Sequence, residues 1–387
     1  MEHSNISEQQ VLTSIPFNKP FTSGKEQEYI AQALKNDHLS GDGPFTKKCR
    51  ELIESIFYGK SALLTTSCTH ALEMTALLLN VRPGDEVIIP SFTFVSTVNA
   101  FALRGAKIVF IDIRRDTKNL DETLIERSIN ANTRAIVPVH YAGVGCEMDT
   151  ISDMAKAHGL AIIEDNAHGI FGKYKNKLLG TFGEMSTLSF HETKNLQCGE
   201  GGALVINDEK FCERAEIIRE KGTNRSRFFR GQVDKYSWVD IGSSYLPSDI
   251  LAAYLLAQLE SKEAIQKRRR ELWNRYHSGL ANWAEAHSIE LPFVPDHCEQ
   301  SYHMFYIMLP DIVARTKLIA HLKRSGIMSV FHYLPLHSSE MGRSMGYSVG
   351  DCPVTEYVSE RILRLPFYAS LSIEEQQYVI DTMLTCF

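Results

Sequence analysis

From about residue 60 to residue 207, short apolar runs rich in β-branched residues alternate with stretches of helical periodicity that begin near Thr69 and Val95. This alternation constrains the fold most, because helices that connect parallel strands cover both faces of a sheet. We therefore predict an α/β fold with a largely parallel main sheet, whose ligands collect at the carboxyl ends of the strands, near Thr66, His140 and Asp165. The expected strands are 62–65, 86–90, 107–112, 134–140, 161–165, 186–190 and 203–207.

The rest of the chain follows a different pattern. After a helix expected over 208–221, the segment 222–244 is polar and rich in arginine and aromatic residues. A loop of that length in a compact domain is usually functional. We predict a disordered N-terminal extension over 1–14, a large domain over 15–255, and a smaller α+β domain over 256–387, hinged near 250–262. Strands are expected there at 303–309 and 328–332, and helices at 248–259, 262–285, 314–325, 355–363 and 373–384.

Charge and cysteine usage exclude several classes of protein. A net charge of −6 argues against a polyanion-binding surface, and the basic run 267–270 fits a solvated helix face, so we expect no nucleic-acid partner. The eight cysteines show no metal-ligand spacing, which predicts no metal site and favours a reducing compartment. No apolar run approaches the roughly 18 residues that span a bilayer, and the start of the chain resembles no secretory signal. We therefore expect a cytoplasmic protein without a membrane partner.

Asp165 ends the strand expected at 161–165, and Lys194 follows the strand expected at 186–190. Taken alone, such a lysine is most often solvated, and such an aspartate is most often a helix cap or a loop acid. Together they suit pyridoxal 5′-phosphate (PLP), since the amine condenses with the cofactor aldehyde and the carboxylate keeps the pyridine nitrogen protonated. His168 has two equal interpretations, a contact with the cofactor or a hydrogen bond within its loop.

Small hydroxyl residues in the segment 65–74 stand directly before an expected helix, where free N–H groups and the helix dipole favour an anion. Alone this segment is a well-capped helix start. Combined with Ser189, five residues before the lysine, it predicts a phosphate site. Phe92 and Phe94 follow another strand, and an aromatic ring there can lie against a flat heterocycle, with core packing as the alternative for one of them.

Several motifs occur in order along the chain and together resemble the DegT/DnrJ/EryC1/StrS sugar aminotransferases. The resemblance extends from about Ile15 to the C-terminus. Within the family, the segments 190–195, 220–226 and 229–236 are similar to the branch that forms dTDP-4-amino-4,6-dideoxygalactose. The motifs are Gly41-Asp42-Gly43-Pro44, 65–72, 83–88, 90–94, 138–143, Glu164-Asp165, 189–191, Lys194-Asn195 and 200–202.

The resemblance implies a PLP-dependent transferase of fold type I that forms a homodimer with active sites built from both subunits. It implies that Lys194 is the Schiff-base lysine and Asp165 the partner of the pyridine nitrogen. It also implies cofactor contacts from Phe94, stacked on the ring, from His168, and from three residues around the phosphate: Ser67, Cys68 and Ser189. One departure is Leu246, which stands where many members carry an asparagine that reaches the phosphate of the neighbouring subunit.

The activity that the resemblance implies is transfer of an amino group from L-glutamate to a dTDP-4-keto-6-deoxyhexose, giving the galacto product for surface polysaccharide synthesis. The alternatives are a C3 transaminase, a 4-transaminase giving the gluco product, a PLP-dependent sugar dehydratase, which replaces the lysine by histidine, and a silent scaffold. We expect sugar or pyrophosphate contacts from six side chains, each with a surface cation or a packed loop residue as its alternative: Lys221, Arg225, Arg230, His332, Tyr333 and His337.

Overall fold

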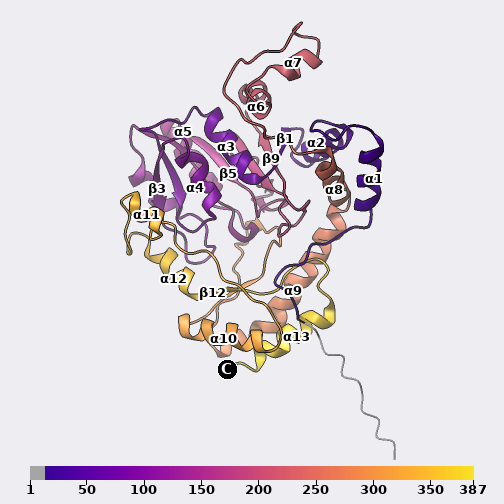
Figure 1. Cartoon of the computed structure of the whole chain (residues 1–387). Coiled ribbons are helices and arrows are strands. Elements are labelled where there is room, and N and C mark those ends of the chain that lie inside the picture. Colours follow the sequence, from indigo (N-terminus) through magenta and orange to yellow (C-terminus); the bar gives the residue numbers. More distant parts are fainter. Residues whose placement is uncertain (1–13) are drawn as a thin grey trace, which may run out of the picture.

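A seven-stranded sheet forms the centre of the molecule in the computed structural model, which describes residues 14–387 (Figure 1). Its strand order is β1-β9-β8-β5-β4-β2-β3. All neighbours pair in parallel except β9, which runs antiparallel to both β1 and β8. The predicted α/β fold with a largely parallel sheet is confirmed. The strands are β1 (Ser61–Thr65), β2 (Glu86–Pro90), β3 (Lys107–Ile111), β4 (Thr133–Ile136), β5 (Ala161–Asp165), β8 (Met185–Ser189) and β9 (Gly202–Ile206).

Helices cover both faces of this sheet, and the period-two pattern of the strands decides which residues meet them. In β1, Leu63 packs into one apolar cluster, while Ala62 and Leu64 pack into another on the opposite face. The first face is covered by α3 (Cys68–Leu78), α4 (Val95–Ala102) and α6 (Cys212–Arg219). The second face is covered by α1 (Glu26–Lys35), α2 (Pro44–Ile56), α5 (Met148–His158) and α8 (Asp249–Glu260).

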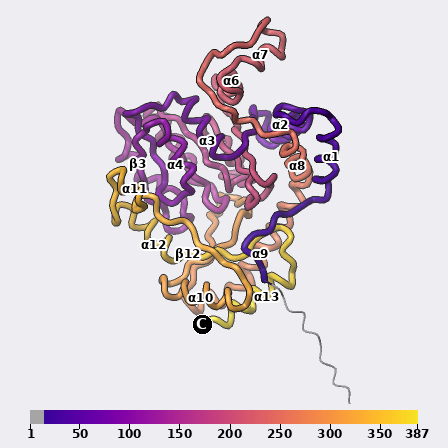
Figure 2. Tube along the Cα trace, in the orientation of Figure 1, coloured from indigo at the N-terminus to yellow at the C-terminus, as the bar shows by residue number. Residues whose placement is uncertain are grey.

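A second apolar core lies below the sheet and contains the C-terminal third of the chain (Figure 2). The 25-residue helix α9 (Lys262–Ala286) leads into it. The last helix, α13 (Ile373–Leu384), begins with a capping box, in which the side chains of Ser372 and Glu375 each accept from the backbone N–H of the other residue. The core is completed by β11 (Tyr306–Met308), α10 (Ile312–Arg324), β12 (Ile362–Arg364) and α13 (Ile373–Leu384). Along its edge lie α11 (Glu340–Ser344) and α12 (Pro353–Arg361).

The chain passes from the large core to the small core within α9, whereas the sequence predicted a boundary at residue 255. Ile265 packs with the large core, whereas Leu272 and the following apolar residues of α9 pack with the small one. At the other end of the described chain, Ile15 also belongs to the small core, where it pairs with Ile327. We therefore propose that the domains divide within α9 and that the residues around Ile15 belong to the small domain. The extension expected over 1–14 lies outside the described residues except for Ser14.

Three sequence expectations need correction. The strand expected at 328–332 is reduced to a single bridge between Val330 and Arg364. The helix expected at 355–363 ends at Arg361, and the chain continues directly as β12. Arg269, expected on a solvated helix face, is 3% exposed because its guanidinium donates to the backbone carbonyls of Tyr302 and His303.

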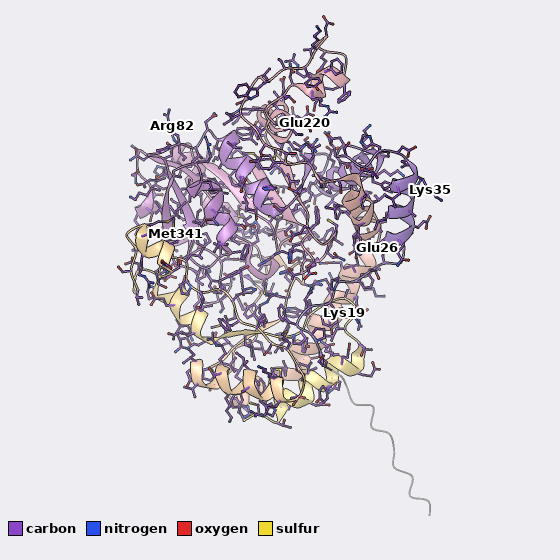
Figure 3. The ribbon with its side chains drawn as sticks, in the orientation of Figure 1. Lys19, Glu26, Lys35, Arg82, Glu220 and Met341 are labelled. Carbon is purple, nitrogen blue, oxygen red and sulfur yellow. The ribbon has the colours of Figure 1, made fainter. Side chains whose placement is uncertain are left out.

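The segment after β9 stands out from the body of the molecule (Figures 1 and 2). It contains α6 and the short helix α7 (Arg225–Phe229), and Glu220 lies at its base, where the backbone bridges to Ser244 (Figure 3). Several large apolar side chains of this segment are exposed, including Phe229 and Trp238. The remaining elements are short: β6 (Lys173–Tyr174), β7 (Lys177–Leu178), β10 (Cys298–Glu299), and the 3₁₀ helices η1 (Glu122–Leu124), η2 (Glu126–Ser128), η3 (Tyr141–Gly143) and η4 (Glu209–Phe211).

All eight cysteines are free thiols, and six of them are buried members of the apolar clusters. None of the helices within residues 14–387 combines the length and the apolar character needed to span a bilayer.

Candidate active site

Asp165 occupies the last position of β5, at the carboxyl edge of the sheet, and is 5% exposed. The hydroxyl of Thr97 donates to Oδ2 at 2.7 Å, and the backbone N–H of Ala167 donates to Oδ1 at 3.1 Å. Thr97 comes from α4, so its position is fixed by the helix that follows β2. These donors hold the carboxylate in one orientation at the wall of a cavity, where it can accept one further donor or cation.

The amino end of α3 forms a second wall of this cavity. Ser67 is the N-cap, and its hydroxyl accepts from the N–H of His70 at 3.1 Å, so this side chain is already used in the cap. The backbone N–H groups of Cys68 and Thr69 lie in the first turn, where no carbonyl of the helix can accept from them. This arrangement can bind an anion mainly through the main chain, and Ser189 lies beside it at the end of β8.

Gly202 allows the sheet to approach this helix end. A Cβ at Gly202 would stand 2.4 Å from the backbone N of Cys68 and 2.4 Å from the carbonyl carbon of Ser67. Gly202 pairs with Ser189 on one side and with Thr65 on the other. A side chain there would displace the helix end. The position of the anion-binding N–H groups therefore depends on a glycine in β9.

Lys194 lies in the loop between β8 and β9 and lines the same cavity. Burial lowers the pKa of its amine from 10.5 to about 8, while the nearby Cys68 and Asp165 partly oppose this shift and Arg364 adds to it. A lysine with a pKa near 8 is about one-tenth neutral at pH 7, a far larger fraction than an exposed lysine has. Its amine can therefore act as a nucleophile toward an aldehyde and as a base.

The cavity has a volume of about 540 Å³, which is within the usual range for cofactor and small-molecule sites. Residues that precede α9 in the sequence and residues that follow it line the cavity together, among them Asp165 of β5 and Arg364 of β12. Besides Lys194 and Asp165 its lining contains the expected residues Ser67, Cys68, Phe94, His168, Ser189, His332 and Tyr333, and also Thr97, His303 and Arg364.

His168 is 7% exposed and stacks on His303, with ring centroids 4.2 Å apart and an interplanar angle of 15°. The stack is fixed from behind, because Nδ1 of His303 donates to Oδ1 of Asn195 at 2.9 Å. Burial lowers the pKa of both imidazoles well below the usual value, and the charge of Lys194 adds to this effect, so both rings are neutral at pH 7. Nδ1 of His168 has no hydrogen-bond partner in the part of the chain that the structure describes.

The two aromatic residues of the 90–97 run have different positions. Phe92 is 1% exposed and packs against Tyr141 and Tyr333, as expected for a core residue. Phe94 is 57% exposed, lies at the N-cap of α4, and borders the cavity. Its ring is available to a flat ligand, and its nearest aromatic neighbour is Tyr333, at 6.3 Å between centroids.

Arg364 was missed by sequence reasoning, although it is the arginine that lines this cavity. It lies in β12, a three-residue strand with no motif of its own, and NH1 donates to Nε2 of His332. The available signal is a charged residue inside the apolar run Ile362-Leu363-Arg364-Leu365. A charge in such a run indicates a buried partner or a ligand.

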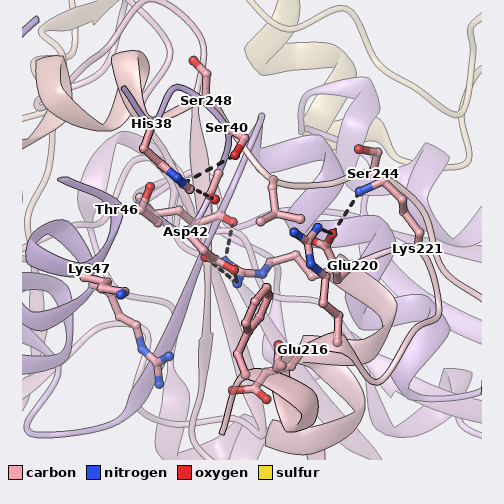
Figure 4. Close-up of a pocket in the computed structure, with 18 of the residues that line it drawn as sticks. His38, Ser40, Asp42, Thr46, Lys47, Glu216, Glu220, Lys221, Ser244 and Ser248 are labelled. Carbon is pink, nitrogen blue, oxygen red and sulfur yellow. Dashed lines mark hydrogen bonds and ion pairs between the residues drawn. The ribbon is translucent and has the colours of Figure 1, made fainter. Parts of the chain in front are cut away.

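The three basic residues expected at the substrate line a different cavity, of about 700 Å³, which Figure 4 shows. Each forms an ion pair within it: Lys221 Nζ with Glu220 at 3.1 Å, Arg225 NH1 with Glu220 at 3.2 Å, and Arg230 NH1 with Glu216 at 2.8 Å. Leu246, at the position where asparagine was noted in other members, also lines this second cavity. Within a single chain, these residues and Lys194 do not share a cavity.

His337 does not reach either cavity. It is fully buried, with its ring between the hydroxyl of Ser91, at 2.7 Å from Nδ1, and Glu356, at 2.8 Å from Nε2. The expected contact with a sugar is therefore wrong for this residue in the chain as folded. His140, expected near the ligand edge, is also fully buried and bonds Oε2 of Glu164 at 3.0 Å.

These residues fit PLP. A buried carboxylate held by two donors suits the protonated pyridine nitrogen, the helix end beside Ser189 suits the phosphate, and Lys194 supplies an amine of low pKa for the aldehyde. Nδ1 of His168, which has no partner among residues 14–387, is a further polar group for the ring substituents. The fold and this site define a PLP-dependent enzyme of fold type I.

The chain belongs to the DegT/DnrJ/EryC1/StrS aminotransferase family, whose sequence description matches residues 21–384. It is 34% identical to the protein MJ1066 of Methanocaldococcus jannaschii, over 95% of this chain and 96% of that protein. It is 30% identical to the spore coat polysaccharide biosynthesis protein SpsC of Bacillus subtilis, again over 95% of this chain and 96% of that protein.

Among solved structures, the chain is similar to the putative sugar aminotransferase Spr1654 of Streptococcus pneumoniae in its PMP-form. The TM-score is 0.89 at 27% identity, covering 96% of this chain and 98% of that one. The PLP-form of the same protein superposes with a TM-score of 0.88, and the two forms have the same identity and coverage. The predicted family and the predicted cofactor are both confirmed.

Proposed function

We propose that the protein transfers an amino group from L-glutamate to the keto carbon of dTDP-4-keto-6-deoxyglucose and forms dTDP-4-amino-4,6-dideoxygalactose, the reaction of EC 2.6.1.59. The observation that carries an aminotransferase function is the single cavity that both Lys194 and Asp165 line. Family membership and the sugar-related descriptions of SpsC and Spr1654 support a sugar as the amino acceptor.

Bound PLP supplies an electron-poor ring that stabilises negative charge at the substrate carbon bonded to nitrogen. The chain supplies the rest. Asp165, oriented by Thr97, would hold the proton on the ring nitrogen. With the cofactor bound, Lys194 would take the proton from that carbon and return it to the carbon on the other side of the nitrogen, since its pKa of about 8 allows both protonation states near neutral pH. The buried walls exclude water from these proton transfers.

The exposed ring of Phe94 suits stacking on the cofactor, and the backbone at Ser67 and Cys68 with the hydroxyl of Ser189 suits the phosphate. The neutral ring of His168 is placed to contact the cofactor, and Tyr333 is placed to contact the sugar. These assignments explain why one cavity collects residues from the segments that follow β1 and β2 and from the last positions of β5 and β8.

We further propose a homodimer in which the second cavity of one subunit completes the first cavity of the other. The second cavity is lined by six lysine or arginine side chains and three acidic ones, so it can attract a pyrophosphate. Lys221, Arg225 and Arg230 would serve the substrate of the neighbouring subunit. The exposed apolar residues of the projecting segment, such as Phe229 and Trp238, favour a covered surface.

The identity of the sugar rests on the three segments similar to the dTDP-4-amino-4,6-dideoxygalactose transaminases of enterobacterial common antigen synthesis. Surface polysaccharide synthesis from cytoplasmic nucleotide sugars is the process that fits. The alternatives are a C3 transaminase acting on a dTDP-3-keto-6-deoxyhexose and a 4-transaminase giving the gluco product. A dehydratase is disfavoured because the lysine is present, and a silent scaffold is disfavoured by the intact lysine and aspartate.

The test is product analysis. Purified enzyme with PLP, L-glutamate and dTDP-4-keto-6-deoxyglucose is expected to give an amino sugar whose nitrogen is on C4 and axial, as assigned by NMR. An equatorial C4 amine would show that the enzyme forms the gluco product and not the galacto product. If no amino sugar forms while the 3-keto isomer is converted, the C4 assignment is rejected.

A further inference from the structure

Three polar side chains outside the linings of both cavities are joined by hydrogen bonds: Ser91, His337 and Glu356. Serine, histidine and glutamate are also the residue types of a hydrolase triad. Here the hydroxyl is out of reach of a substrate, because Ser91 and His337 are both 0% exposed. These bonds therefore need another explanation.

Ser91 lies directly after β2 and begins the segment that carries Phe92 and Phe94. Its carbonyl oxygen accepts from the backbone N–H of Leu336, and its hydroxyl oxygen accepts from the backbone N–H of His337, both at 3.2 Å. The hydroxyl also bonds Nδ1 of His337 at 2.7 Å. This Ser91–His337 junction fastens the end of β2 to a segment that lies 246 positions later in the chain.

The other side of the His337 ring is fixed to the sheet as well. Because a carboxylate only accepts, Nε2 of the ring donates to Glu356 in α12 at 2.8 Å. The first two N–H groups of α12, those of Val354 and Thr355, each donate at 2.8 Å to Asp112, directly after β3. His337 therefore connects the ends of two neighbouring parallel strands, β2 and β3.

Tyr333 lies between two anchors of its segment. At one end Val330 exchanges backbone hydrogen bonds with Arg364 of β12, and NH1 of Arg364 donates to the ring of His332. At the other end is the junction at His337. Tyr333 itself forms no hydrogen bond with any residue of the range 14–387 that the structure describes, so its position depends on these anchors and on the rings around it.

Two of those rings belong to the segment that Ser91 begins. The ring centroid of Tyr333 lies 5.6 Å from that of Phe92 and 6.3 Å from that of Phe94. Tyr333 and Phe94 line the first cavity, and Phe92 is buried. The junction thus sets how two segments that are distant in the sequence face each other across this cavity. Without it, one end of the Tyr333 segment would be released, while the anchor at Arg364 would remain.

We propose that Ser91 and His337 are positioning residues for the amino acceptor, because their junction holds Tyr333 against Phe92 and Phe94 at the wall that meets the sugar. The inference rests on the proposed function, in which Tyr333 contacts the sugar. The stage that uses L-glutamate is independent of the junction, since Asp165 is oriented by other donors and Lys194 lies in another loop.

The first experiment separates the two stages of the reaction. Ser91→Ala removes the hydroxyl and keeps the carbonyl that accepts from Leu336. In single-turnover stopped flow of the pyridoxamine 5′-phosphate form, the ratio of rate to dissociation constant for dTDP-4-keto-6-deoxyglucose is expected to fall about 10-fold. The stage with L-glutamate should stay within about twofold of the parent. An equal loss in both stages, or no loss in either, overturns the proposal.

The matched control is Thr355→Val, which removes a buried hydroxyl that donates to Asp112 at 2.8 Å. Both variants lose one buried hydroxyl beside the end of a strand, so circular dichroism with thermal melting should show similar losses of stability. Only Ser91→Ala should change the stage with the sugar. If Thr355→Val changes that stage equally, general loosening of the fold explains the effect and the proposal fails.

Two variants of His337 test the ring itself. His337→Leu has no polar side-chain atom and should impair the stage with the sugar at least as much as Ser91→Ala. His337→Asn keeps an amide oxygen that can accept from the hydroxyl of Ser91, so it should recover part of the loss. Sugar kinetics like those of the parent in folded His337→Leu, or no recovery in folded His337→Asn, would contradict the role of the junction.

A double-mutant cycle tests whether the junction acts through Tyr333. Ser91→Ala and Tyr333→Phe are made singly and together, and the stage with the sugar is measured in each. Once the phenol is absent, its misplacement costs little, so the combined loss should be smaller than the product of the two single losses. Losses that multiply would show that Ser91 does not act through the phenol of Tyr333.

Hydrogen–deuterium exchange of the holoenzyme gives a measurement that needs no turnover. In Ser91→Ala the backbone N–H of His337 should exchange faster, while that of Val330, paired with Arg364, should remain as protected as in the parent. A parent that converts L-glutamate but not the keto sugar would reject the proposed function. A parent that aminates the sugar no better than folded Ser91→Ala would reject the positioning role alone.

Discussion

At the scale of single residues, the site depends on charges that the fold holds away from water. The amine of Lys194 loses affinity for its proton through burial, and the carboxylate of Asp165 is held by donors from α4 and from its own loop. Both effects are local, but each needs a different part of the chain to be in place. The chemistry of the pair can therefore be tested by changing one side chain at a time.

The buried amine predicts a pH-dependent cost to the cofactor-free protein. Since the pKa of Lys194 is about 8 in the folded protein and 10.5 for an ordinary lysine in an unfolded chain, the unfolded state holds more protons between these two pH values. Stability from this group should therefore rise with pH across that window, by up to about 1.4 kcal/mol per pH unit. Urea unfolding should show Lys194→Met to be more stable than the parent at pH 7, with a difference that shrinks above pH 8. A constant difference from pH 7 to 10 would contradict the lowered pKa.

Asp165→Asn should leave the fold intact and lower the transamination rate by roughly 10²-fold or more, because an amide does not hold the proton on the ring nitrogen. The rate of the first half-reaction in stopped flow is the measurement. Thr97→Val, which removes the 2.7 Å donor to Asp165 but keeps the charge, should have a smaller effect in the same direction. Equal losses in the two variants would show that orientation, not charge, is the important factor.

At the scale of elements, the anion-binding corner is made by the approach of β9 to the first turn of α3. The N-cap Ser67 ends the preceding coil and starts the helix, and Gly202 leaves room for that start. The cofactor site is thus formed by a helix end that a neighbouring strand supports. Its geometry depends on the absence of a side chain in β9.

Gly202→Ala should weaken cofactor binding by about tenfold or more, because its Cβ would meet the backbone of Ser67 and Cys68 and displace the helix end. Equilibrium dialysis of PLP is the measurement. The control is Gly279→Ala in α9, where the added methyl meets the flexible side chain of Ile380 at 3.0 Å, and PLP affinity should be unchanged. Parent-like affinity in folded Gly202→Ala would show that the helix end does not hold the phosphate.

At the scale of the whole molecule, the two cavities of one chain are lined by different residues. The first combines side chains that precede α9 in the sequence with side chains that follow it, and the second is lined by residues of and near α2 and by residues of the projecting segment (Figure 4). If one active site needs both, they must come from two subunits. This requirement can be tested by mixing inactive subunits.

Subunits of Lys194→Ala and subunits in which Lys221, Arg225 and Arg230 are all alanine should each be inactive in the complete reaction. After unfolding and refolding as an equal mixture, about a quarter of the active sites should be intact, since half of the dimers are mixed and each has one complete site. Initial rates with both substrates are the measurement. No recovery in a mixture that size-exclusion chromatography shows to be dimeric would mean that each site uses its own basic residues.

The sequence determined the sheet and the positions of its chemistry. Period-two strands such as 61–65 and 161–165 sort their side chains between two faces, and chain connectivity brings the carboxyl ends of parallel strands to one edge. That is why Asp165, Ser189 and Lys194 could be expected in one place. The alternation of apolar residues within a strand does not depend on packing against distant segments. For most strands of the main sheet, the predicted ends therefore lie within two residues of the observed ends.

Only the tertiary structure decided which distant segments meet. Arg364 enters the cavity because β12 pairs with β11 and bridges to Val330, and His337 is withdrawn because Ser91 and Glu356 enclose its ring. Lys221 and its basic neighbours form a separate cavity, although the sequence places them among the substrate contacts. Such outcomes depend on contacts between separate segments, such as the pair Ser91 and His337, 246 positions apart, and no periodicity or spacing along the chain encodes them.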